Sequence, residues 1–123
     1  MISIVFKDWR VAFEFAEIDH GLKEVVAFTV QAAEELGISR LVVTEIKRND
    51  GGVHSVWRGI DLVPEDRCVD DMNRLRDVIN DAWDYGKPNS SLLVCPPVRH
   101  GTAPHIHLQV RPDFQTSRRS TDH

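Results

Sequence analysis

The sequence has few cysteines, no long apolar run and no excess of basic residues. Its two cysteines, Cys68 and Cys95, are too few and too far apart for a zinc knuckle, and a reduced pair of small buried side chains fits them better. No apolar run approaches the roughly 20 residues of a membrane-spanning helix. Lysine and arginine number 15 against 19 acidic residues, and the resulting net charge of −4 argues against a nucleic-acid-binding face. We therefore expect neither a nucleic-acid partner nor a membrane partner.

A targeting signal is also lacking. In the first residues, MISIVFKDWR, no basic segment precedes an apolar core, so the sequence predicts no signal peptide. We expect a protein that is cytoplasmic as synthesised, and any action at a cell wall would follow its release. The hydrophobic content of 41% suits one domain over residues 1–112 that needs no disulfides, with residues 113–123 as a polar, disordered tail.

The spacing of apolar residues predicts two helices and several strands. One amphipathic helix is predicted over about residues 20–36, ended by Gly37, and a second over about residues 69–83. Residues 40–47 predict a buried strand that leads into a turn at residues 49–52, while SLLVC and HIHLQV predict two further strands. This order of elements predicts an α+β fold, a single small domain with a mainly antiparallel sheet and two flanking helices.

The run PHIHLQV alternates polar and apolar residues with the period of a half-buried strand. His105, His107 and Gln109 would then share one face of the strand, and the three apolar residues between and after them would face the core. Two imidazoles on one strand face are near neighbours, so one can bind a metal ion while the other reaches a water molecule on it. Alternating polar residues also occur on solvated strand faces without any function.

His54 and Asp61, in the upstream run HSVWRGID, make the functional interpretation stronger. A catalytic zinc site has three protein ligands and a position left for water, and zinc accepts imidazole nitrogen together with carboxylate oxygen. Clusters of histidine and aspartate at such spacing are unusual in the absence of a metal. The two side chains converge only if the chain bends between them, as a loop leading into a strand at Gly59 would allow. The isolated histidines, such as His20, fit surface positions.

At these residues the chain resembles a superfamily of zinc peptidases that includes D-Ala-D-Ala peptidases, lysostaphin-type endopeptidases, penicillin-insensitive murein endopeptidase and the hedgehog signalling domain. HSVWRGID is similar to the family's His-x6-Asp motif, and PHIHLQV is similar to its later strand in the His-x-His form. The resemblance covers about residues 41–112 and is closest to short phage-encoded peptidase-like members. It implies that His54, Asp61 and His107 bind Zn²⁺ and that peptidoglycan peptides are the substrate.

Other residues acquire roles from the same resemblance. It implies that His105 is the general base, because Pro104 occupies the position where the dipeptidase branch carries a catalytic glutamate. Thr44 and Arg48 match an upstream threonine and arginine, and Arg48 would hold a substrate oxygen or carboxylate; a solvated arginine at a strand end is the alternative. Two further departures bear on substrate preference: Gly52 replaces a usual serine, and Trp57 stands where a glycine is common.

The implied mechanism is hydrolysis by metal-activated water. Zinc would lower the pKa of a bound water, and His105 would accept its proton and later protonate the leaving amine. Two alternatives stay open. HIHLQV is also the local pattern of histidine-triad nucleotidyl transferases, although that reading gives His54 and Asp61 no role and the sequence has no phosphate-cradling glycine-rich loop. The second alternative is a binding module that zinc stabilises and that has no catalytic activity.

Overall fold

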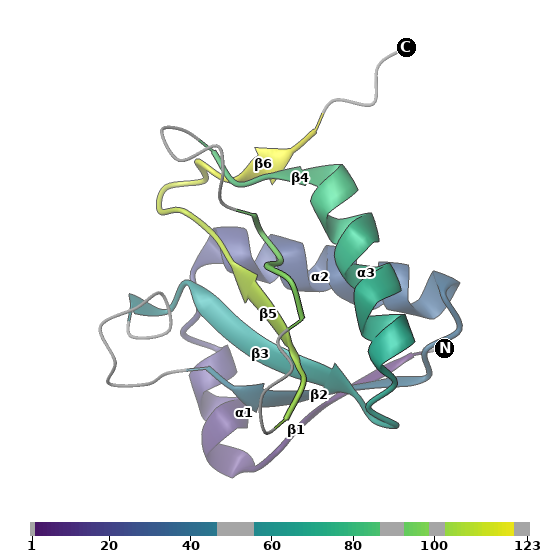
Figure 1. The fold of residues 1–123 in the computed structure, drawn as a ribbon. Coiled ribbons are helices and arrows are strands. Elements are labelled where there is room, and N and C mark those ends of the chain that lie inside the picture. The colour runs from purple at the N-terminus through teal and green to yellow at the C-terminus, as the bar shows by residue number, and fades with distance from the viewer. Residues whose placement is uncertain (1, 47–55, 87–92, 99–102, 120–123) are drawn as a thin grey trace.

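A computed structural model describes residues 2–46, 56–86, 93–98 and 103–119 of the chain (Figure 1). In chain order, the helices and strands are β1 (Ser3–Phe6), α1 (Trp9–Phe15), α2 (His20–Glu35), β2 (Arg40–Glu45), β3 (Gly59–Pro64), α3 (Val69–Ala82), β4 (Trp83–Asp84), β5 (Ile106–Gln109) and β6 (Ser117–Arg118). The predicted turn at residues 49–52 and residues 99–102 of the loop PPVRHGTAP lie outside the described residues.

The main sheet has four strands in the order β1-β2-β3-β5. β1 pairs parallel with β2, whereas β2 with β3 and β3 with β5 pair antiparallel. The helices α2 and α3 contact each other, and they contact β5 and β3 respectively, while α1 packs against β1 and β2 (Figure 1). The predicted α+β class is confirmed, with one parallel pairing that the sequence did not indicate.

The two predicted helices form at the predicted places. α2 begins after Asp19, whose carboxylate accepts a hydrogen bond from the N–H of Gly21 at 2.8 Å, and it ends before Gly37, whose φ of +83° suits glycine. α3 carries Asp70 and Asp71 in its first turn, where the helix dipole favours acidic side chains. It ends at Ala82 because the next residue begins the extended strand β4.

The core lies between the main sheet and the helices. β3 is buried along its whole length, and alternate residues of the neighbouring strands face the same core. The fully buried strand residues that share this face of the sheet are Leu41, Val43, Ile60, Leu62, Ile106 and Leu108. Burying one such side chain contributes roughly 1.5 to 3 kcal/mol, so β3 and β5 are held firmly against α2 and α3. The residues between them in sequence point to the opposite face of the sheet.

The C-terminal residues 113–119 are ordered, so the prediction of a disordered tail is wrong for them. β6 pairs with β4, and the Arg118 guanidinium lies over the Phe28 ring at 4.6 Å from its centroid. Thr116 is buried, and its hydroxyl donates to the backbone oxygen of Tyr85 at 2.7 Å and accepts from the N–H of Arg111 at 2.9 Å. A polar composition did not prevent packing because these polar groups find backbone partners. Residues 120–123 lie outside the described part of the chain.

The predicted strand SLLVC is also not borne out in its described residues. Residues 94 and 95 form a bend, and no strand is present in residues 93–98. The Asn80 side chain holds this segment by accepting from the N–H of Cys95 at 3.0 Å and donating to its carbonyl at 2.7 Å.

Burial raises the pKa of the Cys95 thiol to about 12, so it remains protonated near neutral pH and is unsuited to act as a nucleophile. Cys68 is only partly buried.

Among the helices that the structure describes, none combines the length and the apolar composition needed to cross a membrane.

The C-terminal packing predicts a large stability difference between two glycine variants. A Cβ at Gly86, where φ is +111°, would lie 2.6 Å from the backbone oxygen of Gln115, whereas a Cβ at Gly37 would meet nothing within 4 Å. We expect Gly37→Ala to cost about 1 to 2 kcal/mol through its left-handed backbone, and Gly86→Ala to cost about 1 to 3 kcal/mol more through the clash. Urea unfolding of both variants measures the difference. Equal losses would show that residues 113–119 do not pack against Gly86.

Candidate functional site

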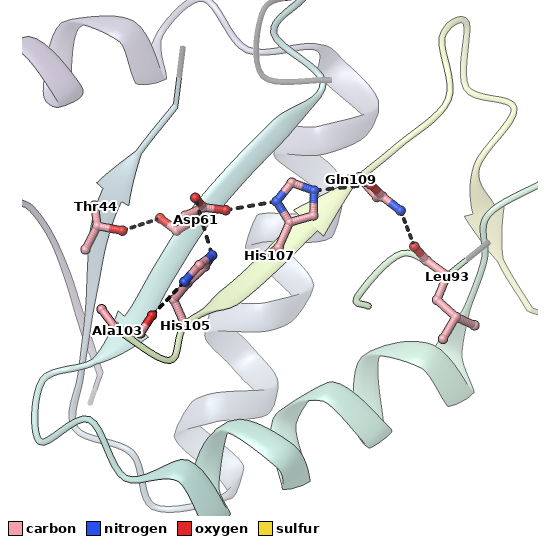
Figure 2. Close-up of polar contacts among 7 residues, drawn as sticks. All are labelled: Thr44, Asp61, Leu93, Ala103, His105, His107 and Gln109. Carbon is pink, nitrogen blue, oxygen red and sulfur yellow. Dashed lines mark hydrogen bonds and ion pairs between the residues drawn. The ribbon is translucent and has the colours of Figure 1, made fainter. Parts of the chain in front are cut away.

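The two histidines of PHIHLQV project from the sheet face opposite the core. Ile106 and Leu108 are fully buried, whereas the alternating residues His105, His107 and Gln109 are partly exposed on the other face (Figure 2). The predicted division of this segment into a polar and an apolar face is therefore confirmed. The division follows from the two-residue period of the strand, with α2 packed against the apolar side.

Asp61 lies directly across from His107, because β3 and β5 pair with these two residues in register. The Asp61 carboxylate is buried and faces both histidines (Figure 2). Its Oδ1 is 2.9 Å from His107 Nδ1, and its Oδ2 is 3.6 Å from His105 Nε2. The fold thus brings Asp61, His105 and His107 together although 46 residues separate Asp61 from His107 in the chain. We call these three residues the Asp61 cluster.

Gln109 determines how the His107 ring is protonated. The amide nitrogen of Gln109 donates to the backbone oxygen of Leu93 at 2.8 Å, so its Oε1 faces His107 Nε2 at 3.2 Å (Figure 2). An amide oxygen is an acceptor, so His107 Nε2 carries a proton. In a neutral ring, His107 Nδ1 then presents a lone pair to the carboxylate oxygen of Asp61. Two lone pairs at 2.9 Å repel each other unless a proton or a metal ion lies between them.

His105 is oriented differently from His107. Its Nδ1 lies 3.0 Å from the backbone oxygen of Ala103, which is an acceptor, so Nδ1 carries the proton (Figure 2). Its Nε2 therefore has a lone pair on the side of Asp61, and 3.6 Å is too long for a hydrogen bond to Oδ2. The His105 side chain is 33% exposed, against 21% for His107 and 6% for Asp61. Of the three residues, His105 is therefore the most accessible and the best placed to exchange a proton with a ligand.

Thr44 supports β3 beside the Asp61 cluster. The register between β2 and β3 shifts between Val43 and Glu45, and the Thr44 hydroxyl there donates to the backbone oxygen of Asp61 at 3.3 Å (Figure 2). Shifts of this kind re-aim side chains next to functional sites. Thr44 thus contacts the backbone rather than the carboxylate of Asp61.

A pocket of about 300 Å³ opens beside His105 and Asp61. Its other lining residues come from β2, from β3, from the segments that follow β1 and β3, and from the segment before β5: Lys7, Val42, Thr44, Glu45, Val63, Arg67 and Ala103. We call it the His105 pocket. Lys7, Glu45 and Arg67 were not among the sequence-predicted site residues, because no motif or spacing connects them before the chain is folded.

Two predicted site residues, His54 and Arg48, lie outside the described residues. Over the ranges that are described, no three histidine, cysteine, aspartate or glutamate side chains are arranged to hold a metal ion. Asp61 and His107, two of the three predicted zinc ligands, lie in contact with each other, and zinc binding by these two residues and by His54 stays a prediction.

Trp57 gives the loop that leads into β3 an unusual backbone. Its φ of +65° lies in the left-handed region that favours glycine, and glycine is common at this position in the peptidases that the sequence resembles. The partly buried Trp57 side chain packs against the core, and its carbonyl accepts from the N–H of Asp19 at 2.9 Å. The chain therefore turns at Trp57, while the predicted convergence of His54 with Asp61 stays a prediction because His54 lies outside the described residues.

The chain was also compared with models of known protein families, with curated proteins and with solved structures. None of the three comparisons gives a match. The chemistry of the Asp61 cluster and the sequence resemblance therefore carry the functional interpretation.

Proposed function

We propose that the protein is a zinc-dependent peptidase that hydrolyses peptide bonds of peptidoglycan. The observation that supports this most is the contact between His107 Nδ1 and Asp61 Oδ1 at 2.9 Å, with the His107 proton held on the other nitrogen by Gln109. This arrangement aims two good zinc donors at one point. The substrate class follows from the resemblance to peptidases of peptidoglycan, in which D-Ala-containing stem or cross-link peptides are cleaved.

The two described donors fit zinc in chemistry and in spacing. Zinc ligands in proteins lie about 2.0 to 2.2 Å from the ion in a tetrahedral arrangement, so two of them are roughly 3.4 Å apart. His107 Nδ1 and Asp61 Oδ1 would have to separate by only about 0.5 Å to reach this spacing. Gln109 supplies the outer hydrogen bond that zinc-binding histidines commonly make through their second nitrogen. His54 would be the third ligand.

The residues around the cluster have separate tasks in the proposed reaction. Zinc would supply the Lewis acidity that makes water reactive near neutral pH. His105 accepts a proton at Nε2, because its Nδ1 proton is committed to the Ala103 carbonyl, and it returns the proton to the leaving amine. Thr44 and the strand pairing keep Asp61 in place. Arg48 is proposed to hold a substrate oxygen.

The contacts of His107 favour this proposal over nucleotidyl transfer. A histidine-triad enzyme would need a ring nitrogen of His107 to attack phosphorus. In this fold Nε2 contacts Gln109 and Nδ1 contacts Asp61, so both nitrogens already face protein groups. A non-catalytic zinc module would share the metal site and differ only in having no turnover.

Metal analysis and two substrates test the proposal together. We expect the purified protein to bind one zinc per chain and to release peptides from peptidoglycan, with no cleavage of a dinucleoside polyphosphate. Zinc without peptide release would indicate a binding module. Cleavage of the dinucleoside polyphosphate without bound metal would support nucleotidyl chemistry, and the absence of metal after expression in zinc-supplemented medium would overturn the zinc site.

A further inference from the structure

The two edges of the main sheet differ in what lies beside them. At the β5 edge, the backbone N–H of Gln109 donates to the Val94 carbonyl at 2.9 Å, and the Gln109 side-chain amide donates to the Leu93 carbonyl at 2.8 Å. At the β1 edge, no other described segment forms a hydrogen bond with the outer side of the strand (Figure 1). β1 is therefore the edge to which a further strand can be added.

The outer side of β1 carries the backbone groups of three residues. β1 pairs with β2 through alternate residues, since the N–H groups of Ser3 and Lys7 donate to carbonyls at and beside β2 at 3.0 and 2.9 Å. The N–H and C=O groups of Ile2, Ile4 and Phe6 consequently point away from the sheet. Within the part of the chain that the structure describes, these groups have no hydrogen-bond partner. They form a template for one more strand.

The composition of this edge favours pairing. Edge strands are commonly protected by lysine, proline or a bulge, and the run ISIVF from Ile2 to Phe6 has no charge, no proline and no glycine. Its four apolar side chains are each only partly buried, and the first charges follow at Lys7 and Asp8. A partner that fits this edge is therefore an uncharged, apolar strand.

Two exposed aromatic residues lie close to the same edge. Trp9 and Phe13 of α1 are 75% and 72% exposed, and their rings contact each other with centroids 5.9 Å apart. Trp9 follows Phe6 by three residues, so it lies within about 11 Å of the strand end, and the Phe15 ring of the same helix lies 5.2 Å from the Phe6 ring. An exposed apolar surface therefore continues from β1 onto α1, as is typical of protein–protein contacts.

A second copy of the chain supplies a strand that matches this edge. When two β1 strands pair antiparallel about a two-fold axis, Ile4 lies opposite Ile4 of the other copy, and Ile2 lies opposite Phe6. All the outward backbone groups of these three residues then find partners, in about six hydrogen bonds. The cross-strand pairs are aliphatic with aliphatic and aliphatic with aromatic, which stabilise a sheet. Two-fold symmetry also closes the assembly at a dimer.

We propose that two copies of the protein form a dimer by antiparallel pairing of their β1 strands about Ile4. The four-stranded sheets join into one continuous sheet of eight strands. Residues opposite each other in an antiparallel pair point to the same face, so the His105 pockets of both copies open on the same face of this sheet. Dimerisation of this kind is independent of the peptidase proposal.

The size of the contact sets its strength. Five strand residues from each copy are fewer than the roughly 20 to 30 residues per partner of a standard interface, and Trp9 and Phe13 enlarge the contact only in part. We therefore expect a weak dimer, with a Kd of roughly 1 to 100 µM. Sedimentation velocity over a concentration series that spans this range measures it. A wild-type protein that stays monomeric throughout the series overturns the proposal.

Charge variants at Ile4 test the register. Ile4→Lys and Ile4→Glu each place two like charges opposite each other across the axis, so each should weaken dimerisation more than about tenfold. An equimolar mixture of the two variants pairs lysine with glutamate and should restore a dimer. Leu93→Lys is the matched control, because Leu93 is exposed at the opposite edge of the sheet, and it should dimerise like wild type. Wild-type dimerisation by both Ile4 variants, or loss of the dimer in Leu93→Lys, rules out pairing through β1.

Hydrogen exchange on the wild type gives a test that needs no variant to fold. The amide protons of Ile2, Ile4 and Phe6 should exchange about fivefold more slowly at ten times the Kd than far below it, because only about a fifth of the chains are then monomeric. Those of Ser3 and Lys7 are bonded within one copy and should change little. A dimer in which the three outward amides exchange as fast as in the monomer would show that another surface, or another class of partner, occupies the contact.

Discussion

Replacing His107 by alanine is expected to remove zinc from the protein, the largest effect of any single substitution at the site. His107 is the better placed of the two strand histidines to bind metal, because its Nδ1 faces Asp61 Oδ1 at 2.9 Å while Gln109 holds its other nitrogen. Loss of an outer hydrogen bond to a ligand typically lowers metal affinity 10- to 100-fold, so loss of the ligand itself should lower it more than about 100-fold. Stability should fall as well, because metal that binds only the folded state stabilises it.

Gln109→Ala is the matched control for this variant. It removes the contact with His107 Nε2 and leaves the proposed ligand in place, so its zinc affinity should fall only about 10- to 100-fold. Competition with a chromogenic chelator measures both affinities, and thermal unfolding with and without added zinc measures the linked stability. Wild-type zinc affinity in His107→Ala would remove His107 from the ligand set.

The elements that the sequence predicted well are those whose signal is local. α2 and α3 have apolar residues at helical spacing over 16 and 14 residues, with an acidic cap or acidic first turn. The polar and apolar faces of β5 follow from a simple alternation of six residues. In each case the apolar residues that become buried recur at a regular spacing within one continuous segment. The position of the element could therefore be predicted to within one or two residues.

The elements that were missed depend on contacts between distant segments. β4 and β6 have two residues each, and they are held by contacts such as Arg118 over the Phe28 ring and Thr116 with the Tyr85 carbonyl. α1 has seven residues, and two of its aromatic side chains, Trp9 and Phe13, are exposed, which hides the helical stripe. The SLLVC run has the composition of a strand, but the backbone N–H and carbonyl of Cys95 form hydrogen bonds with the Asn80 side chain instead of with a neighbouring strand.

The candidate site likewise combines features that a local sequence signal predicts with features that depend on contacts between distant segments. Asp61, His105 and His107 could be named in advance because their spacing matches metal-binding motifs, and strand pairing then placed them in one cluster. The division of labour between the two histidines required the contacts of Gln109 and Ala103, which assign the proton on each ring. The pocket residues Lys7 and Arg67 carry no signal in the sequence, because a lone lysine and a lone arginine are usually solvated surface groups.

His105→Ala is expected to keep zinc and lower kcat by about 10²- to 10⁴-fold, the usual contribution of a general acid–base residue. The reason lies in the orientation of the ring. Its Nδ1 proton is held by the Ala103 carbonyl, its Nε2 is 3.6 Å from Asp61 and not hydrogen-bonded to it, and it is the most exposed member of the cluster. Nothing in this geometry makes it a partner that Asp61 or His107 needs in order to bind metal. His105→Ala and His107→Ala, only two residues apart, should therefore fail for different reasons.

Zinc content and peptide release measured on the same preparations separate the two roles of the strand histidines. His20→Ala is the control for loss of an imidazole, because His20 is exposed at the start of α2, away from the His105 pocket, and this variant should keep both zinc and activity. Equal zinc loss in His105→Ala and His107→Ala would make His105 a ligand and would require another general base. Glu45, which lines the same pocket and pairs with Asp61 across the sheet, would be the candidate. Full peptide release by His105→Ala with zinc retained would contradict proton transfer by His105, since no other change in that variant could restore a lost base.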